Sequence, residues 1–218
     1  MKIAIAGGHG QIALRLVRLL SRRGDDVAAL IRNRDHADDV RAAGAEPVLC
    51  DLERAGREEV AASLEGAEAV VFAAGAGPGS GEARKETMDL GGAVKLIDAA
   101  KAKRVSRYVM ISSMGADPDV EGEGFAAYLR AKGRADAALA ASGLAYTIVR
   151  PGRLTNDPGT GLVTIAESVE RGQVPRDDVA AVIAEVIARE DTSRLTFALV
   201  AGDQPVDEAV TAFAQRRG

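Results

Sequence analysis

The sequence is poor in the residues from which disulfides, metal clusters and aromatic cores are built. Its 218 residues include a single cysteine, Cys50, which excludes an intrachain disulfide and a cysteine-based metal cluster. Tryptophan is absent and aromatic residues make up only 3%, so Ala, Val, Ile and Leu must fill the core. Such a composition is typical of a parallel sheet flanked by helices. His9 and His36 have no partner at the spacing of metal ligands, and we expect no metal site.

Long apolar runs are also missing. No run of about 18 apolar residues occurs, and the first apolar stretch is short and ends in a glycine turn, so we expect neither a transmembrane helix nor a signal peptide. The net charge of −4 argues against general nucleic-acid binding. We therefore expect a cytoplasmic monomer or homodimer that acts on a small molecule, with neither nucleic-acid nor membrane partners.

The first twenty residues, MKIAIAGGHGQIALRLVRLL, organise the rest of the chain. A short apolar strand breaks at Gly7-Gly8-His9-Gly10, and apolar residues then recur with helical spacing. Gly7 permits a tight turn, Gly10 allows the backbone to approach a phosphate, and Ala13 is small enough for the helix to pack on the strand. The first N–H groups of such a helix attract a pyrophosphate. The spacing is G-x-x-G-x-x-A, and a plain strand–turn–helix corner is the alternative.

Strands and helices alternate along the rest of the chain. This alternation predicts an α/β fold with a doubly wound parallel (Rossmann) sheet in the order 3-2-1-4-5-6. We expect one domain over residues 1–218, in which residues 151–218 are a small extension and not an independent domain. The predicted strands span 3–6, 27–31, 47–50, 69–74, 107–113, 144–149, 162–165 and 195–200, and the predicted helices after the first span 35–43, 57–64, 82–103, 124–142, 176–189 and 207–217.

Two local signals accompany these elements. Asp35 is a plausible cap of the helix that ends at Gly44. The segment Gly75 to Gly81 is rich in Gly, Pro and Ser and is a candidate mobile lid.

Ligands of a doubly wound sheet bind beyond the carboxyl ends of its strands, so the residues at those ends are informative. Arg32 follows the second strand, with Asn33 and Arg34 beside it, where a carboxylate would hold the ribose of NAD. A guanidinium there can bind a 2′-phosphate through charge-assisted hydrogen bonds worth about 1.5–3 kcal/mol each. NADP is therefore the predicted cofactor. The alternative is a solvated arginine pair on a surface loop.

The third and fourth strands end in residues suited to an adenosine. Asp51 can accept a hydrogen bond from the adenine amino group while Leu52 covers the ring, although Asp51 can equally serve as a helix cap. Ala73, Ala74 and Gly75 allow the backbone to come close to a ribose, and they are also typical of any tight turn between a strand and a helix.

Candidate catalytic residues follow the fifth strand. Ser112 and Ser113 end it, and Tyr128 and Lys132 lie four apart in the next helix, on one helical face. A free phenol titrates near 10, and a neighbouring ammonium favours its ionised form, so the pair can perform general acid–base catalysis while a serine holds the substrate oxygen. Tyr-x-x-x-Lys alone is common on helix surfaces, but its place after the Ser-Ser strand end favours the catalytic interpretation.

With these motifs in order, the chain resembles the short-chain dehydrogenase/reductase superfamily, and most of all its atypical, compact NAD(P)-binding branch of epimerase/dehydratase-like proteins. The resemblance covers nearly the whole chain and is less secure after about Ile165. The matching stretches are IAIAGGHGQIA, LIRNRD, CDLE, VVFAAGAGPGSG, MDLGGAVKLIDAAK, YVMISSMGADPD, YLRAKGRAD and YTIVRPGRLTNDPGTG.

The resemblance implies roles for individual residues. Ser113, Tyr128 and Lys132 would form the catalytic triad, with Lys132 also touching the nicotinamide ribose. The turn at Pro151 and Gly152 would lie against the carboxamide end of the cofactor. The full predicted cofactor set is Gly7, His9, Gly10, Gln11, Ile12, Arg32, Asn33, Arg34, Asp51, Leu52, Ala73, Ala74, Gly75, Ser112, Tyr128, Lys132, Pro151, Gly152 and Arg153.

The sequence departs from the family pattern in two ways. Asp89 stands where many relatives have an Asn that supports a proton-relay water. The C-terminal portion is short for a protein that must hold a nucleotide sugar, which argues against such a bulky substrate.

The hypothesis is an NADP-dependent oxidoreductase that transfers hydride between the nicotinamide and a small carbonyl, alcohol or quinone-like compound. The alternatives are an NADP-binding sensor without turnover, and a flavin or tetrapyrrole reductase of the same fold. The predicted substrate walls are residues 75–86, 114–124 and 153–161.

Overall fold

The computed structural model describes residues 1–77 and 79–216. The predicted loop 75–81 includes Pro78, and the predicted helix 207–217 includes Arg217; these two residues lie outside the described part of the chain. No helix within the described ranges combines the length and the apolar character needed to cross a bilayer.

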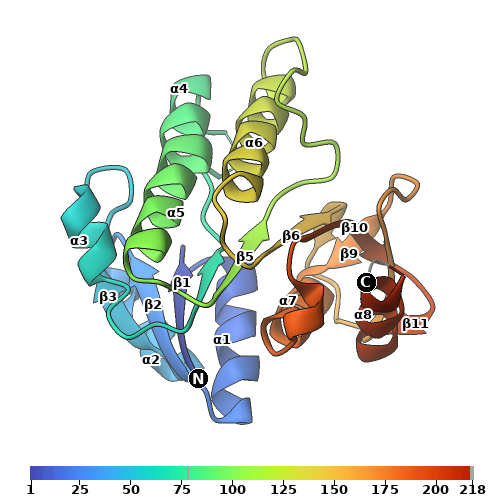
Figure 1. Ribbon diagram of the computed structural model, residues 1–218, viewed down its shortest axis with the longest axis horizontal. Coiled ribbons are helices and arrows are strands. Elements are labelled where there is room, and N and C mark those ends of the chain that lie inside the picture. Colours follow the sequence, from blue (N-terminus) through green and yellow to red (C-terminus); the bar gives the residue numbers. More distant parts are fainter. Residues whose placement is uncertain (78, 217–218) are drawn as a thin grey trace.

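Nine of the described strands form one large mixed sheet with helices on both faces (Figure 1). Its order, β11-β8-β10-β6-β5-β4-β1-β2-β3, contains the predicted Rossmann order, and every pair from β3 through to β10 is parallel. The parallel strands are β1 (Lys2–Ala6), β2 (Asp26–Ile31), β3 (Glu46–Leu49), β4 (Ala69–Phe72), β5 (Arg107–Ile111), β6 (Tyr146–Pro151) and β10 (Leu195–Ala201). The predicted fold class and strand order are confirmed.

The alternation of side chains along each strand divides the core between the two faces of the sheet. Ile3 and Ile5 of β1 point to one face, where they pack with α1 (Gln11–Arg23), α2 (Ala37–Ala43), α7 (Arg176–Ile187) and α8 (Val206–Gln215). Ala4 and Ala6 point to the other face, which α3 (Arg57–Ala62), α5 (Ala93–Ala102) and α6 (Phe125–Ala140) cover. Figure 1 shows α5 and α6 on the face opposite α1 and α7.

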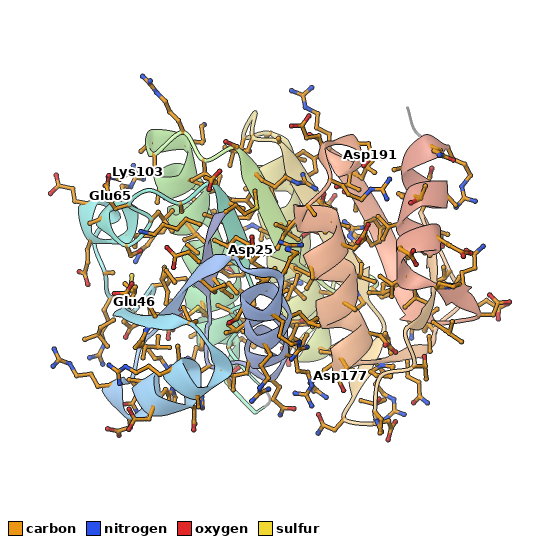
Figure 2. All side chains as sticks on the ribbon, turned by 90° about the horizontal axis from the view of Figure 1, so that it is seen from below. Asp25, Glu46, Glu65, Lys103, Asp177 and Asp191 are labelled. Carbon is orange, nitrogen blue, oxygen red and sulfur yellow. The ribbon has the colours of Figure 1, made fainter. Side chains whose placement is uncertain are left out.

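The C-terminal segment continues the same sheet. β10 pairs with β6, and β8 (Leu162–Ala166) and β11 (Gln204–Pro205) extend the edge in antiparallel fashion. α7 packs beside α1, and Arg15 Nε donates to Asp177 Oδ1 at 2.8 Å across the two helices; Figure 2 labels Asp177 at the start of α7. The predictions missed β7 (Arg153–Thr155) and β9 (Gln173–Pro175), which form a separate two-stranded parallel sheet.

The prediction of one regular helix over 82–103 is wrong, because the segment is helical but not regular. The segment consists of α4 (Glu82–Arg84), a π-helical stretch η2 (Lys85–Gly92) and α5. Two glycines end the π-helical stretch, and Gly has a weak preference for the regular α-helix. The carboxylate of Asp89 points inward and accepts from Ala76 N at 3.1 Å, so the π register also gains a buried hydrogen bond.

The predicted capping role of Asp35 is also wrong. Asn33 is the cap: its side-chain oxygen accepts from Asp35 N at 3.1 Å, at the start of the 3₁₀ turn η1 (Arg34–His36) that precedes α2. Asp35 lies inside that turn, where its own N–H needs a partner. Gly44 does end the helix, in the left-handed conformation with φ 103°.

Candidate functional site

The glycine turn after β1 has the geometry that its sequence predicts. Gly7 adopts φ 78°, and a Cβ atom there would lie 2.7 Å from Ala74 Cα, so only glycine fits between β1 and the segment after β4. Gly10 precedes α1 in an extended conformation and offers no side-chain cap. The first N–H groups of α1, at Gln11 and Ile12, therefore face the turn as donors for an anion.

A cavity of about 250 Å³ lies beyond the carboxyl ends of β1 to β4, where the strand order reverses. Each of these strands contributes to its wall. The lining residues are Gly7, Gly8, His9, Gly10, Leu30, Ile31, Arg32, His36, Cys50, Asp51, Leu52, Ala73, Ala74, Gly75, Arg84 and Met88. The predicted residues that follow the first four strands thus lie largely together, around one cavity.

Arg32 lies at the wall of this cavity with an acidic neighbour. Its side chain is 52% exposed, and its Nη1 is 3.7 Å from Glu53 Oε2. Asp51 Oδ1 accepts from Glu53 N at 3.0 Å and so supports the local turn, the structural role that its sequence left open. Asn33 caps η1, and neither Asn33 nor Arg34 is among the cavity-lining residues.

The two histidines meet at the cavity. The His9 and His36 rings stack with their centroids 3.7 Å apart and an angle of 13° between their planes, and His9 Nε2 is 2.8 Å from Asp39 Oδ2. Their positions in the sequence give no sign of this contact, because the turn after β1 and the turn after β2 become neighbours only when the strands pair. Among the described residues, no cluster of three or more His, Cys, Asp or Glu could hold a metal ion.

Tyr128 and Lys132 lie on one face of α6, as their spacing predicts. Lys132 Nζ is 5.9 Å from the centroid of the Tyr128 ring and donates to Ile111 O, at the end of β5, at 3.3 Å. Its side chain is only 4% exposed, and it is paired with Asp89, whose Oδ1 is 3.2 Å from Lys132 Nζ. Asp89 is fully buried and also bonds Ala76 N, so one carboxylate links the ammonium to the segment that lines the cavity.

The two serines after β5 have different surroundings. Ser112 Oγ donates to Asp136 Oδ2 at 2.8 Å, and Arg150 Nε donates to the same oxygen at 2.9 Å. Burial raises the pKa of the Asp136 carboxyl, against the opposing effect of these two hydrogen bonds. Ser113 Oγ makes only a long contact with Met114 O, at 3.4 Å, and among the described residues it has no hydrogen bond to Tyr128 or Lys132.

The turn after β6 has a structural reason for its glycine. A Cβ atom at Gly152 would collide with Gly172 O, because the backbones that lead into β7 and β9 run close together there. Arg153 Nη2 donates to Gln173 Oε1 across the same two strands. Pro151, Gly152 and Arg153, like Ser112, Tyr128 and Lys132, lie outside the cavity lining, so their contacts with a cofactor stay predictions.

Seven of the lining residues were not among the predicted site residues. Leu30 and Ile31 carry no signal beyond strand burial, Gly8 is part of the turn, and Cys50 precedes a predicted site residue. His36, Arg84 and Met88 come from helical segments whose approach to the cavity depends on tertiary packing. Met88 lies in a segment that the sequence predicts to be a regular helix, so its spacing gave no sign that it would line the cavity.

A parallel Rossmann sheet, a glycine turn at the start of α1 and a cavity at the switch point define a dinucleotide-binding protein. The chain belongs to the NAD(P)H-binding family, whose model matches residues 7–190. The resemblance to epimerase/dehydratase-like members of the short-chain dehydrogenase/reductase superfamily is thereby confirmed.

Relatives of similar length match along almost the whole chain. The sequence is 41% identical over 212 residues to a Bacillus subtilis protein named uncharacterized sugar epimerase YhfK. The alignment covers 96% of this chain and 99% of that protein. A structure from Bacillus halodurans, designated an NAD-dependent epimerase/dehydratase, superposes with a TM-score of 0.91 at 36% identity, over 98% of this chain and 100% of that one. The anaerobilin reductase ChuY from Escherichia coli O157:H7 superposes with a TM-score of 0.78 at 25% identity, over 94% and 98%.

Proposed function

We propose that this protein is an NADP-dependent oxidoreductase that interconverts a small carbonyl or quinone-like compound and its alcohol. The observation that carries the proposal is the position of Lys132, which donates a hydrogen bond to Ile111 O at the carboxyl end of β5. The Tyr128–Lys132 pair therefore lies beyond the carboxyl ends of the parallel strands, as the cavity does. A cofactor bound along that edge would have its phosphates at the glycine turn and its nicotinamide toward α6.

The residues present suit such a cofactor. A Cβ atom at Gly7 would fill the turn, the start of α1 has no side-chain cap, and Arg32 supplies a cation where NADP carries its 2′-phosphate. We expect Arg32 to favour NADP, because a carboxylate at this position would repel the phosphate. Pro151, Gly152 and Arg153 would contact the nicotinamide end.

NADPH, when bound, supplies the hydride that adds to the substrate carbon. Tyr128 then donates its phenolic proton to the substrate oxygen, so that hydride and proton together turn the carbonyl into an alcohol. Lys132 stabilises the phenolate that remains, less strongly than a free ammonium would because it is paired with Asp89. Ser113, whose hydroxyl has only a long contact with Met114 O, holds the substrate oxygen.

The substrate walls are formed by segments that side chains tie together. Lys85 Nζ donates to Gly124 O at 2.9 Å, and Gly124 N donates to Glu82 Oε1 at 2.6 Å, which joins the proposed wall 75–86 to the proposed wall 114–124. Residues 153–161 would close the third side. We expect a small substrate, and we expect the protein to act in the cytoplasm as a monomer or homodimer.

The test combines binding with turnover. Calorimetry should register NADPH binding, and a panel of carbonyl compounds should reveal a substrate that oxidises it. Tyr128→Phe should then lower kcat by roughly 10²–10⁴-fold, the usual contribution of a general acid, without loss of NADPH binding. Tyr146→Phe, which removes a hydroxyl at the start of β6, is the matched control and should leave kcat unchanged. Undiminished turnover by Tyr128→Phe would remove Tyr128 as the proton donor.

A second candidate is an NADPH-dependent reductase of flavins or tetrapyrroles that makes little use of side-chain acid catalysis. Two observations favour it: Asp89 neutralises the Lys132 charge, and one structural relative is named as an anaerobilin reductase. In that case a flavin acceptor would be reduced equally fast by the wild type and by Tyr128→Phe. Binding of NADPH without turnover of carbonyls or flavins would leave the sensor alternative.

A further inference from the structure

Arg84 is a second cation at the cavity wall, contributed by an element that no cofactor motif includes. It ends α4, in the segment after β4, and lines the cavity together with Arg32 from the end of β2. Both side chains contact the same atom, Glu53 Oε2. Arg84 Nε and Nη2 donate to it at 3.2 and 3.1 Å, and Arg32 Nη1 lies 3.7 Å away.

Glu53 is the fixed member of this group. Its other oxygen, Oε1, accepts from Thr87 Oγ1 at 2.8 Å, and its side chain is 21% exposed. The Arg84 guanidinium, hydrogen-bonded twice, is therefore held at the cavity wall. Arg32, half-exposed and beyond hydrogen-bonding distance, remains able to turn toward a ligand.

The charge of the group suits a phosphate monoester. The two guanidiniums of Arg32 and Arg84 and the carboxylate of Glu53 give this group one net positive charge. A phosphate monoester carries a charge of about −1.5 to −2 at pH 7, so it attracts the guanidiniums more strongly than the single charge of Glu53 does. Its oxygens also match the planar donor geometry of a guanidinium.

We propose that Arg84 and Arg32 bind the 2′-phosphate of NADP together, and that Glu53 positions Arg84 for this contact. The inference rests on the proposed function, since it requires a dinucleotide in the cavity. It assigns part of the cofactor preference to a residue that follows β4, outside the motif at the end of β2.

The charge of Glu53 opposes the phosphate while its hydrogen bonds place Arg84. Glu53→Gln removes the negative charge and keeps one acceptor oxygen for Arg84, while its amide nitrogen can donate to Thr87 Oγ1. This variant should therefore bind NADPH a few times more tightly than the wild type and NADH with unchanged affinity.

The experiment measures the dissociation constants of NADPH and NADH by calorimetry for the wild type and for Arg84→Ala. The loss of one charge-assisted contact should weaken NADPH binding by about tenfold or more and NADH binding by less than about twofold. Arg57→Ala is the matched control. Arg57 pairs with Asp98 on the surface and does not line the cavity, so its removal should change neither constant.

Each outcome bears on a different statement. Equal weakening of NADPH and NADH by Arg84→Ala would place Arg84 against the shared adenosine and overturn the proposal, as would unchanged binding of both. Arg84→Gln, which keeps the length of the side chain, provides the same comparison if thermal unfolding shows that Arg84→Ala does not fold. Failure of the folded wild type to bind either dinucleotide would instead refute the proposed function.

Discussion

Asp89 and Lys132 form a charged pair that is almost completely shielded from water. Lys132 Nζ also donates to Ile111 O, and Asp89 Oδ2 accepts from Ala76 N. Each charged group of the pair thus has a backbone partner as well. A buried ion pair gains little over apolar residues, but the loss of one partner leaves the other charge desolvated and alone. A substitution of either Asp89 or Lys132 alone should therefore lower the stability of the fold.

Asp89→Asn should lower the free energy of unfolding by about 3 kcal/mol, because it leaves the Lys132 ammonium without a counter-charge. Adding Lys132→Met removes the orphaned charge, and the double variant should recover part of the loss. Urea unfolding gives the free energy of unfolding of Asp89→Asn, of Lys132→Met and of the double variant. Asp98→Asn, in a surface pair with Arg57, is the control and should cost less than about 1 kcal/mol. Strict additivity of the two single costs would contradict the coupling.

Cys50 has a thiol that the fold protects. It lines the cavity but is almost completely buried, and burial raises the pKa of its thiol above the usual value. Since the thiolate is the reactive form, less of it is present at any given pH in the folded protein than in the unfolded chain.

Alkylation of Cys50 by iodoacetamide at pH 8 should therefore be at least about tenfold slower in the folded protein than in urea. The folded-state rate should keep rising with pH above 9, because the fraction of thiolate still increases there. Mass spectrometry of quenched samples gives both rates. Equally fast labelling of folded and unfolded protein at pH 8 would contradict the burial of this side chain.

At the scale of elements, α6 serves as the support for the loop that precedes it. Gly133 lies one residue after Lys132, and a Cβ atom there would collide with the backbone of Asp117 and Pro118. Arg130 adds a hydrogen bond from Nη1 to Val120 O at 2.7 Å. The loop that is a proposed substrate wall thus rests directly on the helix that bears Tyr128.

Gly133→Ala should destabilise the protein by about 1–3 kcal/mol, although Ala favours helices, because the added methyl group pushes the loop away from α6. A Glu-specific protease should then cut faster at Glu121 and Glu123. Gly56→Ala, where φ is −72° and no atom of the described residues lies within 4 Å of the added Cβ, is the control and should change stability by less than about 1 kcal/mol. Unchanged cleavage in Gly133→Ala would show that the loop does not depend on this contact.

The whole molecule has one apolar core on the α1 side of the sheet that includes the C-terminal extension. The buried residues of α7 pack with those of β1 and α1 in the same cluster, and β10 continues the sheet beside β6. These contacts lead us to propose that residues 151–218 unfold together with the rest of the chain and do not form an independent domain.

Ile183→Ala tests this proposal, because Ile183 is fully buried between α7 and the sheet. We expect a loss of about 2–5 kcal/mol and a single transition, coincident in far-UV circular dichroism and tyrosine fluorescence. Leu162→Ala, at an exposed position of β8, is the control and should cost little. Two separated transitions in Ile183→Ala would show that the extension is a unit of its own.

The sequence by itself determined the Rossmann sheet, the strand order, the glycine turn and the one-faced Tyr128–Lys132 pair. Each of these follows from local rules: buried apolar runs with helices between them, small residues at a tight turn, and a spacing of four on a helix. It also predicted most of the cavity wall, since the carboxyl ends of parallel strands must meet at one edge.

Only the tertiary structure decided the contacts between residues far apart in the chain. The π-helical stretch at Asp89, the stacked His9 and His36 rings, and the meeting of Arg32, Arg84 and Glu53 all depend on how separate elements pack. The β7–β9 pair depends on a close backbone approach at Gly152. Periodicity records which face of an element is buried, but it carries no information on which distant side chain that face will meet, because that choice is made by packing and charge across the assembled fold.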